Sequence, residues 1–232
     1  MSSAAESAGQ RGRTAAGRRG RERILRASME LITEVGLDRV RIAEIARRVD
    51  MSSGQVMYYF ASKEQILLET LAWRERAETV QRQAEMPEAP AGWPRLRLFV
   101  DLYLPTDLND PVWIMWMEAW ARAPHSKEVT DFLDELMLPW RDDLAEIVEQ
   151  GISVGSFERP RSAEGFSTRF CALLDGLAIF RLRQNPELLS SELVDMAMLT
   201  ARAELGPSAV TSGGWPGVGA GPDACGRGRG QT

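Results

Sequence analysis

Few side chains in this sequence have the types and spacing that enzymatic chemistry requires. His125 is the only histidine, and its place between Pro124 and Ser126 suits a helix start better than an acid–base site. Asp142 and Asp143 are adjacent, so on a helix they point in different directions and do not form a metal pair. A small helical enzyme is therefore the least favoured function, and we expect no catalytic residue, no metal site and no cofactor.

The cysteines and the apolar runs exclude further classes of protein. Cys171 and Cys225 are too few and too far apart for a disulfide scaffold or a CxxC metal site. The apolar run 112–117 is far shorter than the ~18 residues that indicate a transmembrane helix. The N-terminus lacks the apolar core of a secretory signal. We expect a cytoplasmic protein with no membrane partner.

The charge is distributed unevenly along the 232 residues, although the whole chain carries a net charge of -5. Residues 1–63 have an excess of basic side chains, whereas residues 64–205 have a large excess of acidic ones. A basic segment ahead of an acidic body indicates that the first part meets a polyanion and the second does not.

The segment Arg41–Phe60 has the pattern of a helix-turn-helix. Two short amphipathic helices are separated by Asp50–Ser52, a turn too tight for the helices to pack antiparallel. The apolar positions that would close a small core with the preceding helix are Ile45, Ala46, Val56 and Phe60. The outward side of the second helix carries polar and aromatic groups suited to base edges and phosphates, namely Ser53, Gln55, Tyr58 and Tyr59. A generic helical hairpin with solvated polar residues is the alternative.

Residues 21–71 resemble the DNA-binding domain of the tetracycline-repressor (TetR) family of bacterial transcription factors. The residues that carry the resemblance are Ile24, Leu25, Ala27, Leu31, Gly36-Leu37, Ile45-Ala46, Ser52–Gly54 and Tyr58–Glu64. The resemblance implies a homodimer that binds a palindromic DNA operator. It also implies a repressor, which a small-molecule inducer in the C-terminal domain releases.

The same resemblance assigns DNA-contacting roles by position. Arg41 and Lys63 would lie at phosphates, and Tyr59 stands where the family often has histidine. The recognition-helix contacts would come from Ser52, Ser53, Gln55 and Tyr58. The sequence departs from the family at Asp50, which replaces a glycine, and at Met57, which replaces an aromatic residue. Asp tolerates left-handed backbone better than most residues, so we expect the turn to survive.

The remaining chain is predicted to be helical between two irregular ends. We expect an all-α fold of about nine helices, with the helix-turn-helix domain at 21–71 and a larger ligand-binding and dimerisation domain at 72–205. Residues 1–20 are predicted to be a disordered Arg-rich arm, either contacting DNA or simply solvated. Residues 206–232 are predicted to be a disordered Gly/Pro-rich tail.

Aromatic residues at helical spacing indicate either ordinary core or a ligand pocket. Trp113, Trp116 and Trp120 fall on one helix face, and Asp175 interrupts an apolar face without a basic residue one turn away. A buried carboxylate is costly unless paired, and indoles suit cations, so a cationic or apolar ligand is expected. The full set of predicted ligand contacts is Phe99, Tyr103, Trp113, Trp116, Met117, Trp120, Trp140, Phe170 and Asp175.

The body has a second, diffuse resemblance. Residues 113–124 and 175–177 are similar to the regulatory domains of choline-responsive repressors of betaine synthesis. Apolar faces on the segments 162–184 and 188–205 are expected to form the dimer interface that the TetR resemblance implies. A helical protein-interaction module is the rival from another class, but it leaves the basic first segment unexplained.

Overall fold

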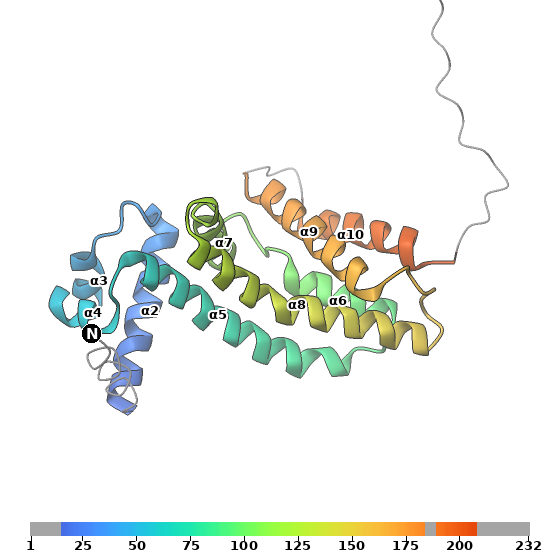
Figure 1. Cartoon of the computed structure of the whole chain (residues 1–232), viewed down its shortest axis with the longest axis horizontal. Helices are drawn as coiled ribbons and strands as arrows, with labels where there is room; N and C mark the ends of the chain where they lie inside the picture. The colour runs from blue at the N-terminus through green and yellow to red at the C-terminus, as the bar shows by residue number, and fades with distance from the viewer. Residues whose placement is uncertain (1–14, 184–188, 208–232) are drawn as a thin grey trace, which may run out of the picture.

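The computed structural model describes residues 15–183 and 189–207, and every regular element in those ranges is a helix (Figure 1). The described part holds nine α-helices and two short 3-10 helices, in agreement with the predicted fold class. In chain order the α-helices are α2 (Ala15–Val35), α3 (Ile42–Arg48), α4 (Ser53–Tyr59), α5 (Lys63–Glu85), α6 (Trp93–Tyr103), α7 (Pro111–Trp120), α8 (Lys127–Ser153), α9 (Ala163–Leu182) and α10 (Ser190–Leu205).

Helices α2, α3 and α4 form the helix-turn-helix unit at one end of the molecule (Figure 1). Gly36 ends α2 with φ of 77°, a conformation that glycine adopts without steric cost. Asp50 has φ of 52° in the turn before α4, so the predicted left-handed residue is present although it is not glycine. Ile45, Ala46, Val56 and Phe60 are all buried, as their spacing predicted.

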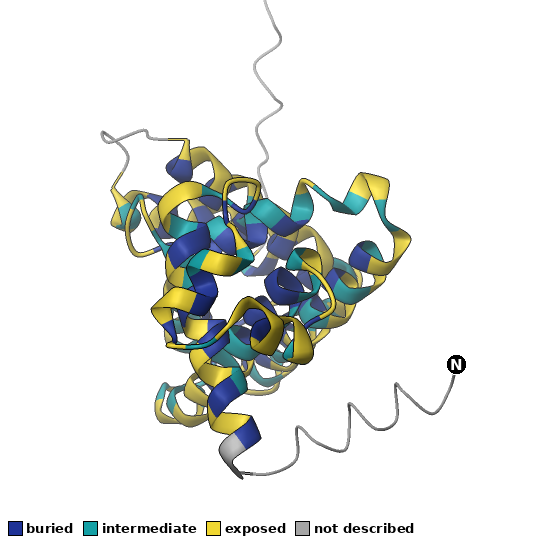
Figure 2. Ribbon diagram, turned by 90° about the vertical axis from the view of Figure 1, so that its left-hand side faces the viewer, coloured by how far each residue is buried: buried dark blue, intermediate teal, exposed yellow. Residues whose placement is uncertain are grey.

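The body is a bundle in which α8 contacts α5, α6, α7 and α9, and α10 packs on α6 and α9. Buried residues lie on the sides of the helices that face one another, as Figure 2 shows by colour. Helix α5 begins in the helix-turn-helix unit and continues to Glu85 in the body, past the predicted domain limit at residue 71. One continuous helix therefore joins the two parts.

The two predicted irregular ends fall largely outside the described residues. Residues 1–14 and 208–232 are not described, so the predictions for these parts of the arm and the tail lie outside the described residues. The prediction for 1–20 is wrong in its last part, because Ala15–Gly20 form the first turns of α2. No helix in the described ranges is long and apolar enough to span a bilayer.

The predicted dimer residues need a correction. Phe170 and Leu177 belong to the apolar face of the segment 162–184 that was expected at the dimer interface, but both are buried within the single chain, and Phe170 stacks on Phe166 with ring centroids 5.1 Å apart. The exposed apolar side chains of α9 and α10 lie on other parts of the surfaces of these two helices. They are Ile179 and Phe180 on α9, and Met196 and Leu199 on α10.

Candidate nucleic-acid interface and ligand cavity

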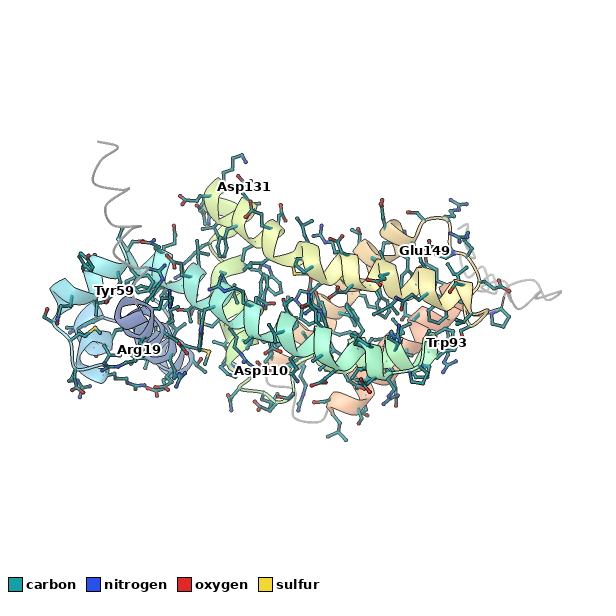
Figure 3. All side chains as sticks on the ribbon, turned by 90° about the horizontal axis from the view of Figure 1, so that it is seen from below. Arg19, Tyr59, Trp93, Asp110, Asp131 and Glu149 are labelled. Carbon is teal, nitrogen blue, oxygen red and sulfur yellow. The ribbon has the colours of Figure 1, made fainter. Side chains whose placement is uncertain are left out.

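The outward face of α4 is a polar and aromatic surface at one end of the molecule. Ser53, Gln55 and Tyr58 are exposed, Tyr58 to 50%, whereas Val56 on the opposite side is completely buried. Figure 3 places Arg19 at the same end, opposite the end that carries Trp93 and Glu149. An exposed helix face bordered by arginine suits a groove lined by phosphates.

Gln55 is partly committed to the start of its own helix. Its backbone N–H donates to Ser52 Oγ at 3.2 Å, and its side-chain Oε1 accepts the Ser52 backbone N–H at 2.7 Å. This reciprocal pair is a capping box, which satisfies two amides at the helix N-terminus. One lone pair of the Gln55 oxygen is therefore used by the cap, which leaves the other lone pair and the two amide N–H groups for a base.

The four remaining predicted DNA contacts lie in different settings. Arg41 and Ser52 are exposed. Tyr59 is half-buried beside α2, where a Cβ added at Gly20 would lie only 2.8 Å from its hydroxyl. Lys63 points inward and donates to three backbone carbonyls, those of Leu37, Asp38 and Val40, at 3.1, 3.2 and 3.0 Å. All three N–H donors of the ammonium group are therefore used within the protein.

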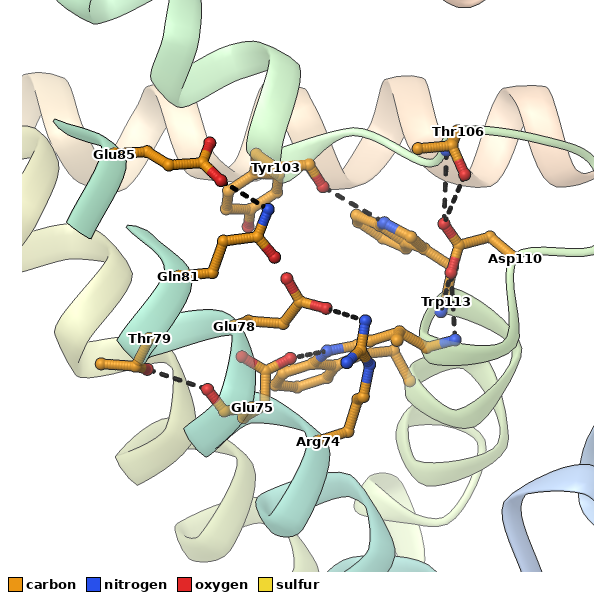
Figure 4. A network of polar contacts seen from close by, with 12 residues as sticks. Arg74, Glu75, Glu78, Thr79, Gln81, Glu85, Tyr103, Thr106, Asp110 and Trp113 are labelled. Carbon is orange, nitrogen blue, oxygen red and sulfur yellow. Dashed lines mark hydrogen bonds and ion pairs between the residues drawn. The ribbon is translucent and has the colours of Figure 1, made fainter. Parts of the chain in front are cut away.

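A cavity of about 290 Å³ lies in the body between α5, α6, α7 and α8. The aromatic residues of its wall are Tyr103, Trp113, Trp116, Trp120 and Trp140. Their rings contact one another, with centroids 5.9 Å apart for Trp113 and Trp120 and 5.4 Å apart for Trp116 and Trp120. Figure 4 shows Tyr103 and Trp113 on one side of the polar groups of α5. The cavity therefore offers several aromatic rings to a ligand.

Glu75 is the buried carboxylate of this cavity and was not predicted. Its two oxygens accept the indole N–H groups of Trp116 at 2.7 Å and Trp140 at 3.0 Å. Burial raises the pKa of Glu75 above its usual value, and the two indole hydrogen bonds oppose that rise. The sequence held a signal for it, since Glu75 follows Leu68, Leu71 and Ala72 at helical spacing on an apolar face.

Asp175 lines the same cavity from α9. The Tyr103 hydroxyl donates to its Oδ1 at 2.7 Å, so its hydrogen-bond partner comes from another helix and is a phenol rather than a base. Burial raises the pKa of Asp175 to about 6, against the opposing effects of the Tyr103 hydrogen bond and the Arg141 charge. Asp175 also lines a neighbouring cavity that Arg141 borders.

Three of the predicted ligand contacts lie away from the cavity wall. Phe99 is fully buried, packs edge-on against Trp140 and does not line the cavity. Met117 is half-buried on α7 and Phe170 is buried on α9, and neither lines the cavity. Sequence periodicity groups residues on one helix face, but the neighbouring helix decides which of them meet open space.

Helix α7 joins the cavity to the helix-turn-helix unit. Its Trp113, Trp116 and Trp120 line the cavity, while Glu118 accepts the Leu37 backbone N–H at 3.1 Å. Arg122, just beyond α7, pairs with Glu118 at 2.9 Å and with Asp38 at 2.8 Å. We call these contacts to the loop between α2 and α3 the α7 contact. Lys63 holds the same loop from α5, so this loop is bonded by both parts of the chain.

The curated relatives are bacterial regulators. The chain is 31% identical over 112 residues to the HTH-type transcriptional regulator BetI of Stenotrophomonas maltophilia, covering 47% of this chain and 56% of the relative. It is 31% identical over 106 residues to BetI of Burkholderia mallei, covering 44% and 53%. The chain thus spans about half the length of the curated relatives it matches.

Solved structures resemble the chain over most of its length. A transcriptional regulator from Saccharomonospora viridis, in complex with choline, has a TM-score of 0.73 and 28% identity, covering 80% of this chain and 96% of its own. The fatty acid degradation regulator FadR of Bacillus halodurans, with a TM-score of 0.66 and 18% identity over 77% of this chain and 92% of its own, shares the fold.

Two family models match, and together they cover more than two thirds of the chain. Residues 24–70 match the bacterial regulatory proteins of the tetR family, and residues 94–206 match the C-terminal domain of BetI-type transcriptional repressors. The first match spans the helix-turn-helix unit, and the second spans α7 and most of the cavity wall. The chain therefore belongs to the TetR family of transcriptional regulators, a family that is not enzymatic, and its C-terminal domain is of the BetI type.

Proposed function

We propose that this protein is a homodimeric repressor that binds a palindromic DNA operator through α4 and is released by a small cationic ligand bound in the body. The observation that carries the proposal is the presence of two sites joined by α7. One is an exposed polar face on a helix-turn-helix, and the other is an aromatic cavity with one buried carboxylate, Glu75, and one half-buried carboxylate, Asp175. A regulator requires two such sites and a physical connection between them.

The DNA contacts are assigned from exposure and charge. Ser53, Gln55 and Tyr58 would meet base edges, and Arg41 would lie at a phosphate. Tyr59 and Ser52 would support the helix from its two ends. Lys63 would contact a phosphate only if it released the carbonyls of the loop after α2, so its expected contribution to DNA affinity is smaller than that of Arg41.

The ligand is proposed to be a quaternary amine or a related cation. The structure from Saccharomonospora viridis was solved with choline, and the cavity of this chain has the chemistry that such a group requires. Aromatic faces attract a cation that has left water, at roughly 2 kcal/mol for a desolvated contact. Tyr103, Trp113, Trp116 and Trp120 supply the faces, and Glu75 and Asp175 supply negative charge.

Dimerisation is proposed to use the exposed apolar side chains of α9 and α10. Phe180 is 49% exposed and Leu199 70% exposed, and α9 and α10 lie side by side on one side of the body (Figure 1). Large exposed apolar side chains on two packed helices are the kind of surface that a protein partner covers. A dimer would then present its two α4 helices to the two half-sites of the operator. These half-sites would be separated by one turn of the DNA or by a multiple of one turn.

Selection of bound sequences from random duplex DNA tests the proposal, followed by release with choline. We expect a palindromic consensus, and choline should weaken binding to it. Tyr58→Ala should lose affinity for the consensus while keeping the wild-type melting temperature, because Tyr58 is exposed. Recovery of random sequences only would refute the DNA-binding role, and a consensus insensitive to choline and to related cations would refute the inducer.

A further inference from the structure

Five carboxylates line the cavity, and three of them are already matched by the protein. Glu78 pairs with Arg74 at 2.5 Å. Asp101 pairs with Arg97 at 3.8 Å. Asp110 caps the N-terminus of α7, where it accepts the backbone N–H groups of Val112 and Trp113. Figure 4 shows the Arg74–Glu78 pair and the Asp110 cap on different sides of the cavity.

The other two carboxylates, Glu75 and Asp175, have neutral partners only. Glu75 accepts two indole N–H groups, and Asp175 accepts a phenol O–H. Within residues 15–183 and 189–207 neither forms an ion pair. Neutral donors satisfy the lone pairs of a carboxylate, but its charge is then compensated only in part, by arginines that do not pair with it.

The nearest arginines are engaged or lie on other sides. Arg82 is buried, its Nε donates to Asp143 at 2.5 Å, and its guanidinium stacks over the Trp140 ring at 3.7 Å from the centroid. Arg82 does not line the cavity; its charge is paired with Asp143, and it also lowers the pKa of Glu75 through space without forming an ion pair with it. Arg141 lines the neighbouring cavity and acts on Asp175 from there.

Glu75 and Asp175 lie at the two ends of one chain of side-chain contacts. Tyr103 donates to Asp175, and its ring meets the Trp140 ring edge-on with centroids 4.8 Å apart. Trp140 in turn donates to Glu75. A ligand extended along this pair of rings would have one carboxylate near each of its ends. The cavity volume of about 290 Å³ approaches that of pockets for drug-sized ligands, about 300–1,000 Å³.

From this charge distribution we infer that the preferred ligand is a dication, an elongated molecule with two ammonium groups separated by a short spacer. One ammonium group lies beside Glu75 and the other beside Asp175, with the aromatic rings between and around them. A single cation such as choline compensates only one of the two carboxylates and leaves the other beside neutral donors. This inference rests on the proposed function, since it specifies the ligand of the same cavity.

A series of bis(trimethylammonium) alkanes of increasing spacer length tests the inference in the full-length protein. Tryptophan fluorescence and calorimetry would give the Kd of each compound, of choline, and of the uncharged analogue 3,3-dimethylbutan-1-ol. We expect one spacer length to bind about tenfold tighter than choline, because two cationic groups instead of one then lie beside a carboxylate, and the uncharged analogue to bind weakest. A minimum of the Kd at one spacer length would itself indicate two fixed charges in the cavity. This part of the test therefore uses only the wild-type protein.

Two variants test which carboxylate binds each ammonium group of the dication. Glu75→Gln and Asp175→Asn should each reduce the advantage of the dication over choline to less than about threefold. Asp101→Asn is the matched control, because Asp101 lines the same cavity but is paired with Arg97, and it should keep the advantage. Melting temperatures identify a variant that does not fold, and the wild-type spacer series then stands alone as the test.

The possible results separate this inference from the proposed function. If choline binds as tightly as every dication, or if the advantage survives both substitutions, the dication is overturned while a choline-type inducer stands. If neither choline nor any dication binds, the cationic inducer and the dication both fail. A spacer optimum that Asp175→Asn abolishes and Asp101→Asn preserves supports the inference.

Discussion

Removing the α7 contact should uncouple the ligand cavity from the DNA-binding face. Glu118 is the centre of this contact, because it accepts the Leu37 N–H at 3.1 Å and pairs with Arg122, which in turn pairs with Asp38. Glu118→Leu deletes the hydrogen bond and the first ion pair together. Glu118→Gln keeps an oxygen for the Leu37 N–H but loses the charge.

The magnitude follows from the exposure of each partner. A hydrogen bond from an amide to a charged acceptor contributes about 1.5–3 kcal/mol. The ion pair of Arg122 with Asp38 contributes little, about 0–1 kcal/mol, since the Asp38 side chain is 95% exposed and screened by water. If the ligand acts by breaking this contact, the coupling free energy between ligand binding and DNA binding is about 2 kcal/mol. The DNA affinity without ligand should then be roughly 30-fold higher than the DNA affinity with ligand.

Fluorescence anisotropy with the selected operator, without and with saturating choline, measures that ratio. In Glu118→Leu we expect it to fall toward one while tryptophan titration still gives the wild-type choline Kd. Glu118→Gln should keep most of the ratio, and Lys127→Met, which removes the exposed Lys127–Asp131 pair, should keep all of it. A wild-type ratio in Glu118→Leu would refute a role for this contact in coupling.

Three further predictions concern single residues. Lys63→Met should lower the free energy of unfolding by about 1–3 kcal/mol in denaturant titrations without DNA, because three carbonyls lose their donor, whereas Arg41→Met should weaken DNA binding and leave stability unchanged. Asp175 holds its proton more tightly folded than unfolded, so the free energy of unfolding should fall as pH rises from about 4 through about 6, and Asp175→Asn should remove that slope in thermal melts. Below pH 6 the protonated carboxyl should also bind choline more weakly. Leu199→Arg should give a folded monomer in sedimentation, and a dimer would contradict the proposed interface, whereas Leu177→Arg should lower the melting temperature because Leu177 is buried in the subunit.

Local features of the sequence determined much of the helix-turn-helix unit. The spacing of Ile45, Ala46, Val56 and Phe60 predicted which sides of α3 and α4 are buried, and the turn residue Asp50 adopts the expected left-handed backbone. These outcomes depend on periodicity and on the conformations that single residues tolerate. Both properties act over a few residues and are present in the unfolded chain.

The body was predicted less completely, because its chemistry depends on which helices meet. Trp113, Trp116 and Trp120 share a helix face by spacing, but the cavity beside them exists only where α5, α6 and α8 leave space. Glu75 was overlooked as one acidic residue among many in the body. Only the packing of α5 against α7 and α8 gives it two indole partners.

The sequence by itself determined the helical fold, the turn geometry and the outward residues of α4, because each follows from interactions within about one helical turn. Only the tertiary structure decided that Lys63 bonds to carbonyls of the loop between α2 and α3, and that Phe99 packs against Trp140 and does not line the cavity. It also decided that Asp175 meets a tyrosine rather than a base. The hydrogen-bonded partners among these contacts are separated by 23 to 72 residues along the chain. Such contacts depend on how the helices pack rather than on local spacing.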